Sequence, residues 1–385
     1  MLAPSHRPSN REGHWLVWLQ RDRFRLRLAL EPDLKRAAGF LLIAADFSFP
    51  FSHVMLISRP PWARNPFTSP VCHFAGCVGR VGHASDFGAL TGVTVVLCEG
   101  GAVAGVDIGG MATGTQEMDV LSPLHITPLV HAVTLAGGSA FGLEAASGVR
   151  KYLEQKGVGF VFGPARVPIV PAMILFDLGI GKADVRPTRE MGEVAAAAAN
   201  AGAVVEGSVG AGTGATVGKL FGMSRAMKGG IGSFTVTAGT KGVLVSALAV
   251  VNAFGDIREP GTGKLVAGCR RSATSRDLIG TEKVLLAGGR SGDGGGNTTL
   301  CVVATNAKLT KVGATRLAKM AQAGVLRALS PGHTMVDGDI VVVLSIGTLE
   351  EEMNVLGVAA AEAVGQAIVR GVRMAKGMGG VVGLG

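Results

Sequence analysis

The chain has 385 residues, of which 48% are apolar, 17% are charged and 59 are glycine. The apolar fraction excludes a disordered chain, and the glycines show no Gly-X-Y period, which excludes collagen. The five cysteines have no regular spacing, which argues against a small disulfide-rich secreted protein. The net charge of +9 suggests nucleic acid as a partner. Whether this suggestion applies to the whole chain depends on where the charged residues lie.

Most of the net charge lies at the N-terminus. Residues 1–78 contain 10 of the 37 lysines and arginines, 5 of the 28 acids, all three tryptophans and only three glycines. Three interpretations of this segment are open. It is a basic arm that binds nucleic acid, since arginines stand at alternate positions of residues 21–27, or it is a targeting segment. The third interpretation is an extension translated from an upstream start codon, with Met55 as a later start. We expect a poorly ordered extension, followed by one catalytic domain over residues 79–385.

The apolar stretch over residues 40–57 does not predict a membrane span. Asp46, Pro50 and His53 interrupt it, and it begins too far into the chain for a signal peptide. We therefore expect a cytoplasmic protein that has neither a membrane nor a nucleic acid as its partner.

From residue 79 onward, β-branched runs alternate with helical stretches. The first strand patterns are residues 92–98 and 101–108, separated by a turn at Glu99-Gly100. Further strands are predicted over residues 131–135, 233–238, 243–251, 299–305 and 339–345. Helices are predicted over residues 140–155 and 188–199, after Thr310, and over residues 350–374. Residues 255–296 are polar and glycine-rich, which predicts a long exposed loop or linker. The strand runs are apolar on both faces, which favours sheets covered by helices in a layered α/β fold.

Two glycine-rich segments suggest phosphate binding. The turn over residues 137–139 departs from the dinucleotide fingerprint at its third position, but it leaves backbone N–H groups free to meet an anion or oxyanion. Residues 212–219 resemble a P-loop, but Thr213 stands where the first glycine is required and Leu220 replaces the magnesium-binding hydroxyl. We therefore expect no nucleotide cofactor.

Motifs for metal binding are absent from the sequence. The closest approach is a group of cysteines and histidines over residues 72–83, and the other three cysteines stand alone. No paired C-x-x-C, no H-E-x-x-H and no G-x-S-x-G motif occurs. We expect no metal, and we expect the isolated cysteines to be small buried thiols.

The most informative segment is residues 294–303, where a run of glycines meets Asn297, Thr298 and Thr299 at the start of an apolar strand. It matches a glycosylation sequon, which is a weak interpretation without a secretory signal, and it is also an ordinary loop-to-strand boundary. A third interpretation is chemical: the Thr298 hydroxyl attacks the Asn297 carbonyl, and hydrolysis of the ester releases a chain that begins with Thr298. The new α-amine, with an ordinary pKa of about 8, can then act as base for its own hydroxyl.

Several motifs in a fixed order resemble the DmpA-type aminopeptidase family, which includes the β-aminopeptidases and the nylon-oligomer endohydrolase. They are residues 80–83 (RVGH), 101–119 (GAVAGVDIGGMATGTQEMD), 137–144 (GGSAFGLE), 296–299 (GNTT) and 333–339 (HTMVDGD). The resemblance covers roughly residues 79–346 and does not extend to residues 1–78.

The resemblance implies an αββα four-layer sandwich, shared with the ornithine acetyltransferases and similar in plan to N-terminal-nucleophile hydrolases. It implies that the precursor cleaves itself between Asn297 and Thr298, which gives an α chain of residues 79–297 and a β chain of residues 298–385. It also implies a homo-oligomer of several such αβ units and catalysis without a cofactor.

The resemblance also implies roles for five residues. Thr298 is the nucleophile, Lys219 lies beside it and stabilises the alkoxide, and Asn252 holds the developing oxyanion. Asp337 and Asp339 lie at alternate positions of an extended segment, where they orient the nucleophile and pair with Lys219. Each has an ordinary alternative: a solvated loop lysine, a turn residue after a strand, and a β-turn between the two aspartates.

Gly138, Phe141 and Glu144 lie where the resemblance implies a substrate pocket. The nylon-oligomer hydrolase has tyrosine at the position of Phe141, so a contact from that phenol is absent here. Glu144 either pairs with a substrate ammonium or faces solvent, and His333 is expected to be structural. We expect a self-processing, aminopeptidase-like hydrolase of peptides or small amino-amides. The alternatives are an acyltransferase of the ornithine acetyltransferase type and a binding module that never matures.

Overall fold

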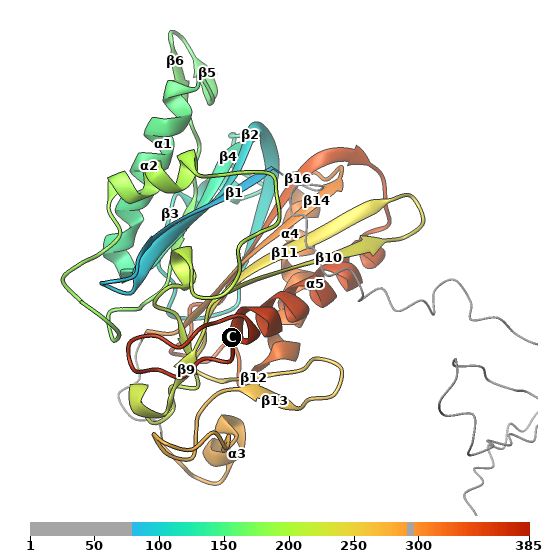
Figure 1. Ribbon diagram of the computed structural model, residues 1–385. Helices are drawn as coiled ribbons and strands as arrows, with labels where there is room; N and C mark the ends of the chain where they lie inside the picture. The colour runs from blue at the N-terminus through green and yellow to red at the C-terminus, as the bar shows by residue number, and fades with distance from the viewer. Residues whose placement is uncertain (1–78, 291–295) are drawn as a thin grey trace, which may run out of the picture. The chain divides into compact units, whose positions relative to one another are not determined.

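The computed structural model describes residues 79–290 and 296–385, and its main strands form two large sheets that share β2 (Figure 1). The predicted extension, residues 1–78, lies outside the described residues. The first sheet contains, in order, β10 (Ile231–Ala238), β11 (Val243–Asn252), β14 (Thr298–Ala307), β16 (Ile340–Leu349) and the second half of β2 (Thr91–Ile108). The second sheet contains, in order, β1 (Arg80–Asp86), the first half of β2, β4 (Val130–Ala136), β7 (Ala172–Ile174) and β3 (Thr115–Gln116).

One long strand, β2, belongs to both sheets. The sequence predicted two strands with a turn at Glu99-Gly100, and this prediction is wrong because the strand continues from Thr91 to Ile108. Its register with β4 shifts between Leu97 and Ala102, and Gly101 has a φ of 86°. Such a bulge bends a strand without ending it, so β2 leaves one sheet and enters the other.

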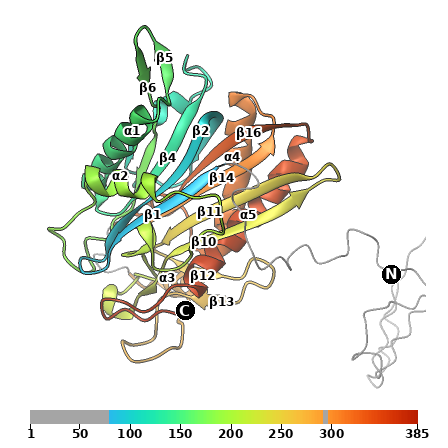
Figure 2. The same ribbon diagram turned by 45° about the horizontal axis from the view of Figure 1, so that its top comes forward.

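Helices cover the outer faces of the two sheets. The helices α1 (Ala145–Gln155) and α2 (Arg189–Ala197) pack on the second sheet, and α4 (Lys311–Ala328) and α5 (Met353–Arg373) pack on the first (Figures 1 and 2). Thr188 and Thr310 cap α2 and α4 by accepting backbone N–H groups of the first turn, as the sequence predicted. The predicted helix over residues 140–155 begins as the 3₁₀ helix η5 (Ser139–Glu144) and becomes α-helical only at α1.

Three apolar cores separate these four layers. On β14, Cys301 and Val303 pack toward α4 and α5, whereas Leu300 and Val302 pack between the two sheets. A third core, which includes Val149 of α1, lies between the second sheet and its helices. Because alternate residues of a strand face opposite sides, the two-sided apolar runs of the sequence produce this arrangement. The predicted αββα four-layer sandwich is confirmed.

The helix α5 is long and apolar enough to cross a membrane by length and composition alone. However, 72% of its most apolar window is buried in the protein, where α5 covers β10 and β11. It therefore has the burial of a core helix.

The segment over residues 255–290 is largely irregular and partly exposed but has short elements in it, so its prediction as a long exposed loop or linker is only partly right. It contains β12 (Asp256–Arg258), β13 (Leu265–Ala267) and α3 (Thr281–Leu286), and β12 pairs with β15 (Leu329–Ser330). The buried Asp256 carboxylate accepts the backbone N–H groups of Cys269 and Thr281, which ties the segment together. A few hydrogen bonds to one carboxylate thus order a stretch that has little apolar patterning.

The remaining elements are short. They are η4 (Met118–Leu121), β5 (Phe160–Phe162), β6 (Ala165–Val167), η6 (Gly210–Gly212), β8 (Thr216–Val217), η7 (Met223–Arg225) and β9 (Met227–Lys228). Cys98, Cys269 and Cys301 are buried free thiols, as the sequence predicted.

Candidate active site

Thr298 is the first residue of β14, and it lies directly opposite Asn252, the last residue of β11. Two residues further along the two strands, Leu300 and Val250 point into the core between the sheets. The two-residue period of a strand therefore directs Thr298 and Asn252 toward the second sheet. Both side chains are buried, and Thr298 lies at the N-terminal end of β14.

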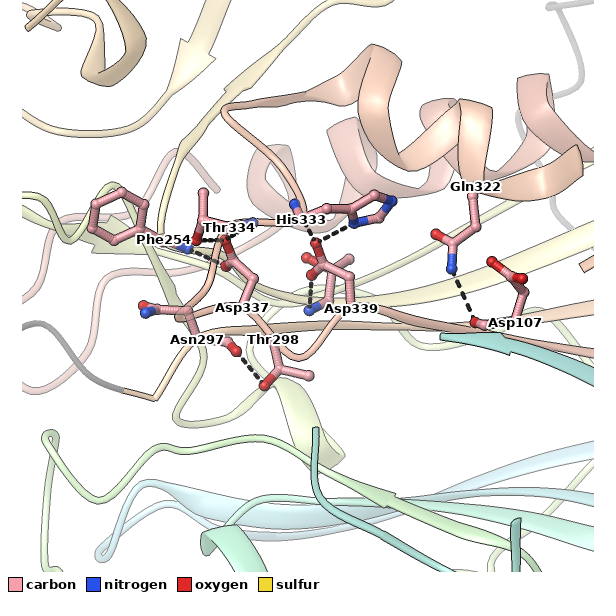
Figure 3. Close-up of polar contacts among 10 residues, drawn as sticks. Asp107, Phe254, Asn297, Thr298, Gln322, His333, Thr334, Asp337 and Asp339 are labelled. Atoms are coloured by element: carbon pink, nitrogen blue, oxygen red, sulfur yellow. Dashed lines mark hydrogen bonds and ion pairs between the residues drawn. The ribbon is translucent and has the colours of Figure 1, made fainter. Parts of the chain in front are cut away.

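The carbonyl group of Asn297 is held by donors from two sides. Its oxygen accepts a hydrogen bond from Thr298 Oγ1 at 2.5 Å and one from the Gly338 N–H at 2.8 Å. The backbone N–H and the side-chain Nδ2 of Asn297 both donate to the Val336 carbonyl, at 3.3 and 3.2 Å. The peptide that joins Asn297 to Thr298 is therefore fixed by the strand-like segment that precedes β16 (Figure 3).

Lys219 and Asn252 hold the preceding peptide group. Lys219 Nζ donates to the backbone and side-chain oxygens of Asn252, both at 2.9 Å, and more weakly to the Gly296 carbonyl at 3.5 Å. Asn252 Nδ2 donates to the same Gly296 carbonyl at 3.3 Å and to the Phe176 carbonyl at 3.0 Å. The structure therefore brings together three residues that were predicted from distant parts of the sequence: Thr298, Lys219 and Asn252.

The ammonium group of Lys219 is buried almost completely. Burial lowers the pKa of Lys219 to about 7, and the positive charge of Lys228 lowers it in the same direction, whereas the negative charges of Asp337 and Asp177 oppose this shift. A lysine with such a pKa carries its proton only part of the time at neutral pH, so it can both accept and donate a proton.

Asp339 is buried and accepts three hydrogen bonds. Its Oδ1 accepts the Thr299 N–H at 2.8 Å, and its Oδ2 accepts the backbone N–H of His333 at 3.1 Å and lies 2.9 Å from His333 Nδ1. Asp339 therefore contacts the residue that follows Thr298 and does not contact the Thr298 hydroxyl.

Asp337 is buried beside it and has different partners. Its Oδ1 accepts the Phe254 N–H at 3.1 Å, and its Oδ2 accepts the backbone N–H and the hydroxyl of Thr334, at 3.2 and 2.5 Å (Figure 3). Burial, together with the negative charge of Asp339, raises the pKa of Asp337 to about 6.

The expected pairing of Lys219 with Asp337 and Asp339 is not found. Within residues 79–290 and 296–385, the ion pairs include none between Lys219 and either carboxylate. The carboxylates are occupied by backbone N–H groups, a threonine and a histidine, so Asp337 affects Lys219 only through its longer-range charge. Asp339 holds the backbone next to Thr298 instead, and Asp337 holds the backbone of Phe254 and Thr334.

The turn that contains Gly138 is not an open anion site. The N–H of Gly137 donates to the Gly92 carbonyl, that of Gly138 to Asp177 Oδ1 at 2.7 Å, and that of Ser139 to the Leu175 carbonyl. The expectation of free N–H groups at this turn is therefore wrong. Distant residues supply all three acceptors, so no local pattern reveals them.

Phe141 and Glu144 lie on the surface of η5. The Arg186 guanidinium lies over the Phe141 ring, 3.7 Å from its centroid, and 54% of Phe141 is exposed. Glu144 is also exposed, which agrees with the solvent-facing alternative. In the described part of the chain, neither side chain has a hydrogen bond or ion pair with the residues around Thr298.

Three features of the site were not predicted: the Gly338 N–H, the His333 contact with Asp339, and Phe176. A Cβ atom on Gly296 would lie 2.3 Å from Phe176 Cγ, so the ring packs directly on the residue before Asn297. Phe176 follows β7 without any local pattern that marks it, and only the tertiary fold brings it to Gly296. His333 and Gly338 belong to a recognised motif, but the motif does not reveal their contacts.

Metal binding has no support in the described ranges. Residues 79–290 and 296–385 contain no group of three or more histidines, cysteines and acids that could hold a metal ion. Lys219 Nζ, Asn252 Nδ2 and Asp339 Oδ1 have backbone or side-chain partners there instead.

Comparisons with known proteins agree on one family. The family model described as peptidase family S58 matches residues 77–384. An uncharacterized aminopeptidase of Mycobacterium leprae is 39% identical over 67% of this chain and 72% of its own length. A 6-aminohexanoate-oligomer endohydrolase of Agromyces sp. is 28% identical over 65% of this chain and 67% of its own length.

Among solved structures, the chain is similar to the L-aminopeptidase D-Ala-esterase/amidase of Ochrobactrum anthropi, which is described as a variant of the Ntn hydrolase fold. The TM-score is 0.59 at 18% sequence identity, and the match covers 81% of this chain and 90% of the other. At this identity the similarity concerns the fold alone, and it agrees with the four layers described above.

Proposed function

The chain belongs to peptidase family S58 and is a peptidase or amidohydrolase, and we propose that it cuts its own Asn297–Thr298 bond and then uses Thr298 as an N-terminal nucleophile. The observation that carries this proposal is the Asn297 carbonyl, whose oxygen accepts both the Thr298 hydroxyl at 2.5 Å and the Gly338 N–H at 2.8 Å. The attacking group and a donor for the developing charge thus meet at one carbonyl.

In the proposed cleavage, Thr298 Oγ1 forms a bond to the Asn297 carbonyl carbon. Negative charge develops on the carbonyl oxygen, where the Gly338 N–H stabilises it. The C–N bond to Thr298 then breaks, the proton lost by the hydroxyl is transferred to the released amine, and an ester remains. Water hydrolyses this ester, which leaves a carboxylate on Asn297 and restores the hydroxyl of Thr298, now beside a free α-amine.

Lys219 and Asn252 support this step by restraining the neighbouring peptide. Both donate to the Gly296 carbonyl, so the chain just before the reacting bond is restrained by two buried donors.

In the proposed turnover, the α-amine of Thr298 removes the hydroxyl proton and the oxygen attacks the carbonyl of an amide substrate. The substrate amine leaves with that proton, and water then hydrolyses the acyl-threonine. Withdrawal of the Gly296 segment after cleavage would free the N–H groups of Lys219 and Asn252 for the oxyanion of the substrate. The names of the relatives, aminopeptidase and oligomer endohydrolase, favour peptides or small amino-amides as substrates.

Denaturing electrophoresis tests the proposal. The wild-type protein should give two bands, and N-terminal sequencing of the smaller one should begin at Thr298.

Thr298→Ala should remain a single chain without activity on L-alanine, D-alanine or β-alanine p-nitroanilides, whereas the conservative variant Thr298→Ser should be cut and active. A wild-type chain that stays intact on incubation, or turnover by Thr298→Ala, would refute the mechanism. Acetyl transfer from acetyl-ornithine without amide hydrolysis would reassign the enzyme as an acyltransferase.

A further inference from the structure

The ring of His333 lies against one oxygen of the buried Asp339 carboxylate, and the other oxygen holds the backbone next to Thr298. Asp339 Oδ2 is 2.9 Å from His333 Nδ1 and accepts the backbone N–H of His333 at 3.1 Å, while Oδ1 accepts the Thr299 N–H at 2.8 Å (Figure 3). Asp339 is fully buried. A buried carboxylate is costly unless its oxygens are hydrogen-bonded, so this carboxylate depends on these two residues.

The hydrogen-bonding pattern fixes the tautomer of His333. Both oxygens of Asp339 accept backbone N–H groups, so the carboxylate is an acceptor and His333 Nδ1 is the donor. The other ring nitrogen, Nε2, is buried and has no hydrogen-bond partner among the described residues. A proton on Nε2 would therefore be buried without an acceptor, which disfavours it. A proton on Nδ1 therefore satisfies the hydrogen bond to Asp339.

The backbone of His333 brings its N–H and its ring to the same oxygen. Its φ is +55°, in the left-handed region that few residues other than glycine and asparagine adopt easily. The ring packs on the backbone of Gly109, where a Cβ atom would lie 2.5 Å from the ring carbon Cε1. The ring thus lies between Gly109 and Asp339, with little room for another orientation.

We propose that His333 is a positioning residue for Thr298. By donating from Nδ1 it holds Asp339 so that Oδ1 keeps the Thr299 N–H in place, and the peptide between Thr298 and Thr299 keeps the hydroxyl aligned with the carbonyl it attacks. His333 does not touch the reacting atoms. This inference rests on the proposed function, because it takes Thr298 as the nucleophile.

Three variants separate the ring from the backbone. His333→Asn keeps a residue that tolerates the left-handed conformation and places an N–H donor near the position of Nδ1. His333→Gly keeps the backbone conformation and its N–H bond to Asp339 but removes the ring donor. His333→Ala removes the ring and also strains the backbone. Self-cleavage is followed by electrophoresis, kcat and KM are measured on the matured protein, and thermal unfolding reports the fold.

We expect His333→Asn to cleave and turn over within about threefold of wild type. His333→Gly should lose about ten- to a hundredfold in the rate of cleavage and in kcat, as expected for one hydrogen bond to a charged group, with little change in KM. His333→Ala should lose at least as much. His125→Asn is the matched control, because His125 lies in a loop and its ring, among the described residues, contacts Thr127 N–H and, at 4.0 Å, Asp119; it should behave as wild type.

Any one of three results would overturn the proposal. The first is wild-type cleavage and kcat in folded His333→Gly, and the second is a folded His333→Asn that is as slow as His333→Gly. A change confined to KM would also contradict a positioning role. Failure of the proposed function is a separate outcome, since it appears as turnover by Thr298→Ala whatever the His333 variants do.

Discussion

Replacing Gly296 by alanine is expected to slow self-cleavage by a factor between about 30 and a few thousand. Gly296 has a φ of +84°, and a Cβ atom there would lie 2.3 Å from Phe176 Cγ. The left-handed conformation costs an alanine about 1–2 kcal/mol, and forcing a methyl group into a packed site costs about 1–3 kcal/mol. The sum, about 2–5 kcal/mol, corresponds to a factor between about 30 and a few thousand, at about 1.4 kcal/mol for each tenfold change.

This cost should appear in the cleavage rate because the chain can avoid it by moving the Gly296 carbonyl away from Lys219 and Asn252. The peptide that contains Asn297 would then leave the position in which Gly338 and Thr298 meet its carbonyl oxygen. Phe176→Ala in the Gly296→Ala background removes the ring contact but leaves the strained φ, so it should restore only the steric part, about 1–3 kcal/mol.

Pulse-labelled cell-free translation followed by denaturing electrophoresis gives the cleavage rate directly. Gly261→Ala is the matched control, because a Cβ atom at Gly261 meets no atom within 4 Å and its φ is not positive; this variant should cleave like wild type. If Gly296→Ala is cut at the wild-type rate, or if Phe176→Ala gives it no rescue, the Phe176 contact does not hold the reacting peptide.

Two further predictions concern buried charges. Burial lowers the pKa of Lys228 from 10.5 to about 7, so the unfolded chain binds an extra proton between these pH values and the free energy of unfolding rises with pH across this window. Lys228→Met should make that rise smaller, as measured by urea unfolding at pH 7 and pH 9, and an unchanged slope would contradict the assignment. The charge of Asp337 raises the pKa of Lys219, which lies at about 7, so Asp337→Asn should lower that pKa further. NMR of ¹³C-labelled lysine measures it, and a pKa that stays or rises would be incompatible with the proposed electrostatics.

The sequence predicted the layers of the fold well because the information is local. The apolar run predicts β14 at nearly its observed ends, and the capping residue Thr310 predicts the start of α4. The apolar runs on both strand faces require helices outside the sheets. The prediction failed at Glu99-Gly100, where residues typical of a turn form a bulge inside β2. The bulge is distinguished from a turn only because β2 pairs with β4 on one side of it and with β16 on the other. The local sequence around Glu99 does not reveal these strand pairings.

The site was predicted in part for a similar reason. Thr298, Lys219 and Asn252 were found through motifs, and the structure brings them together. The N–H groups expected to be free in the turn at Gly138 are instead bonded, because Gly92, Asp177 and Leu175 reach them from distant parts of the chain. The ion pair expected for Lys219 is absent from the described residues, because both carboxylates are occupied by local partners. Which hydrogen-bond donor pairs with which acceptor depends on tertiary contacts, and a sequence motif does not encode these contacts.

The central position of β14 has a consequence for refolding. β14 lies between β11 and β16, and the segment that begins at Thr298 supplies β14, α4, β16 and α5, which share one apolar core with β11. A cut before Thr298 would leave two polypeptides interleaved within one sheet, so they would stay together without a covalent link. Folding of the uncut chain is unimolecular, whereas refolding of the cut protein would need two molecules to meet and would depend on concentration. After the cut, unfolding would therefore be hard to reverse, and the folded state would persist mainly because it unfolds slowly.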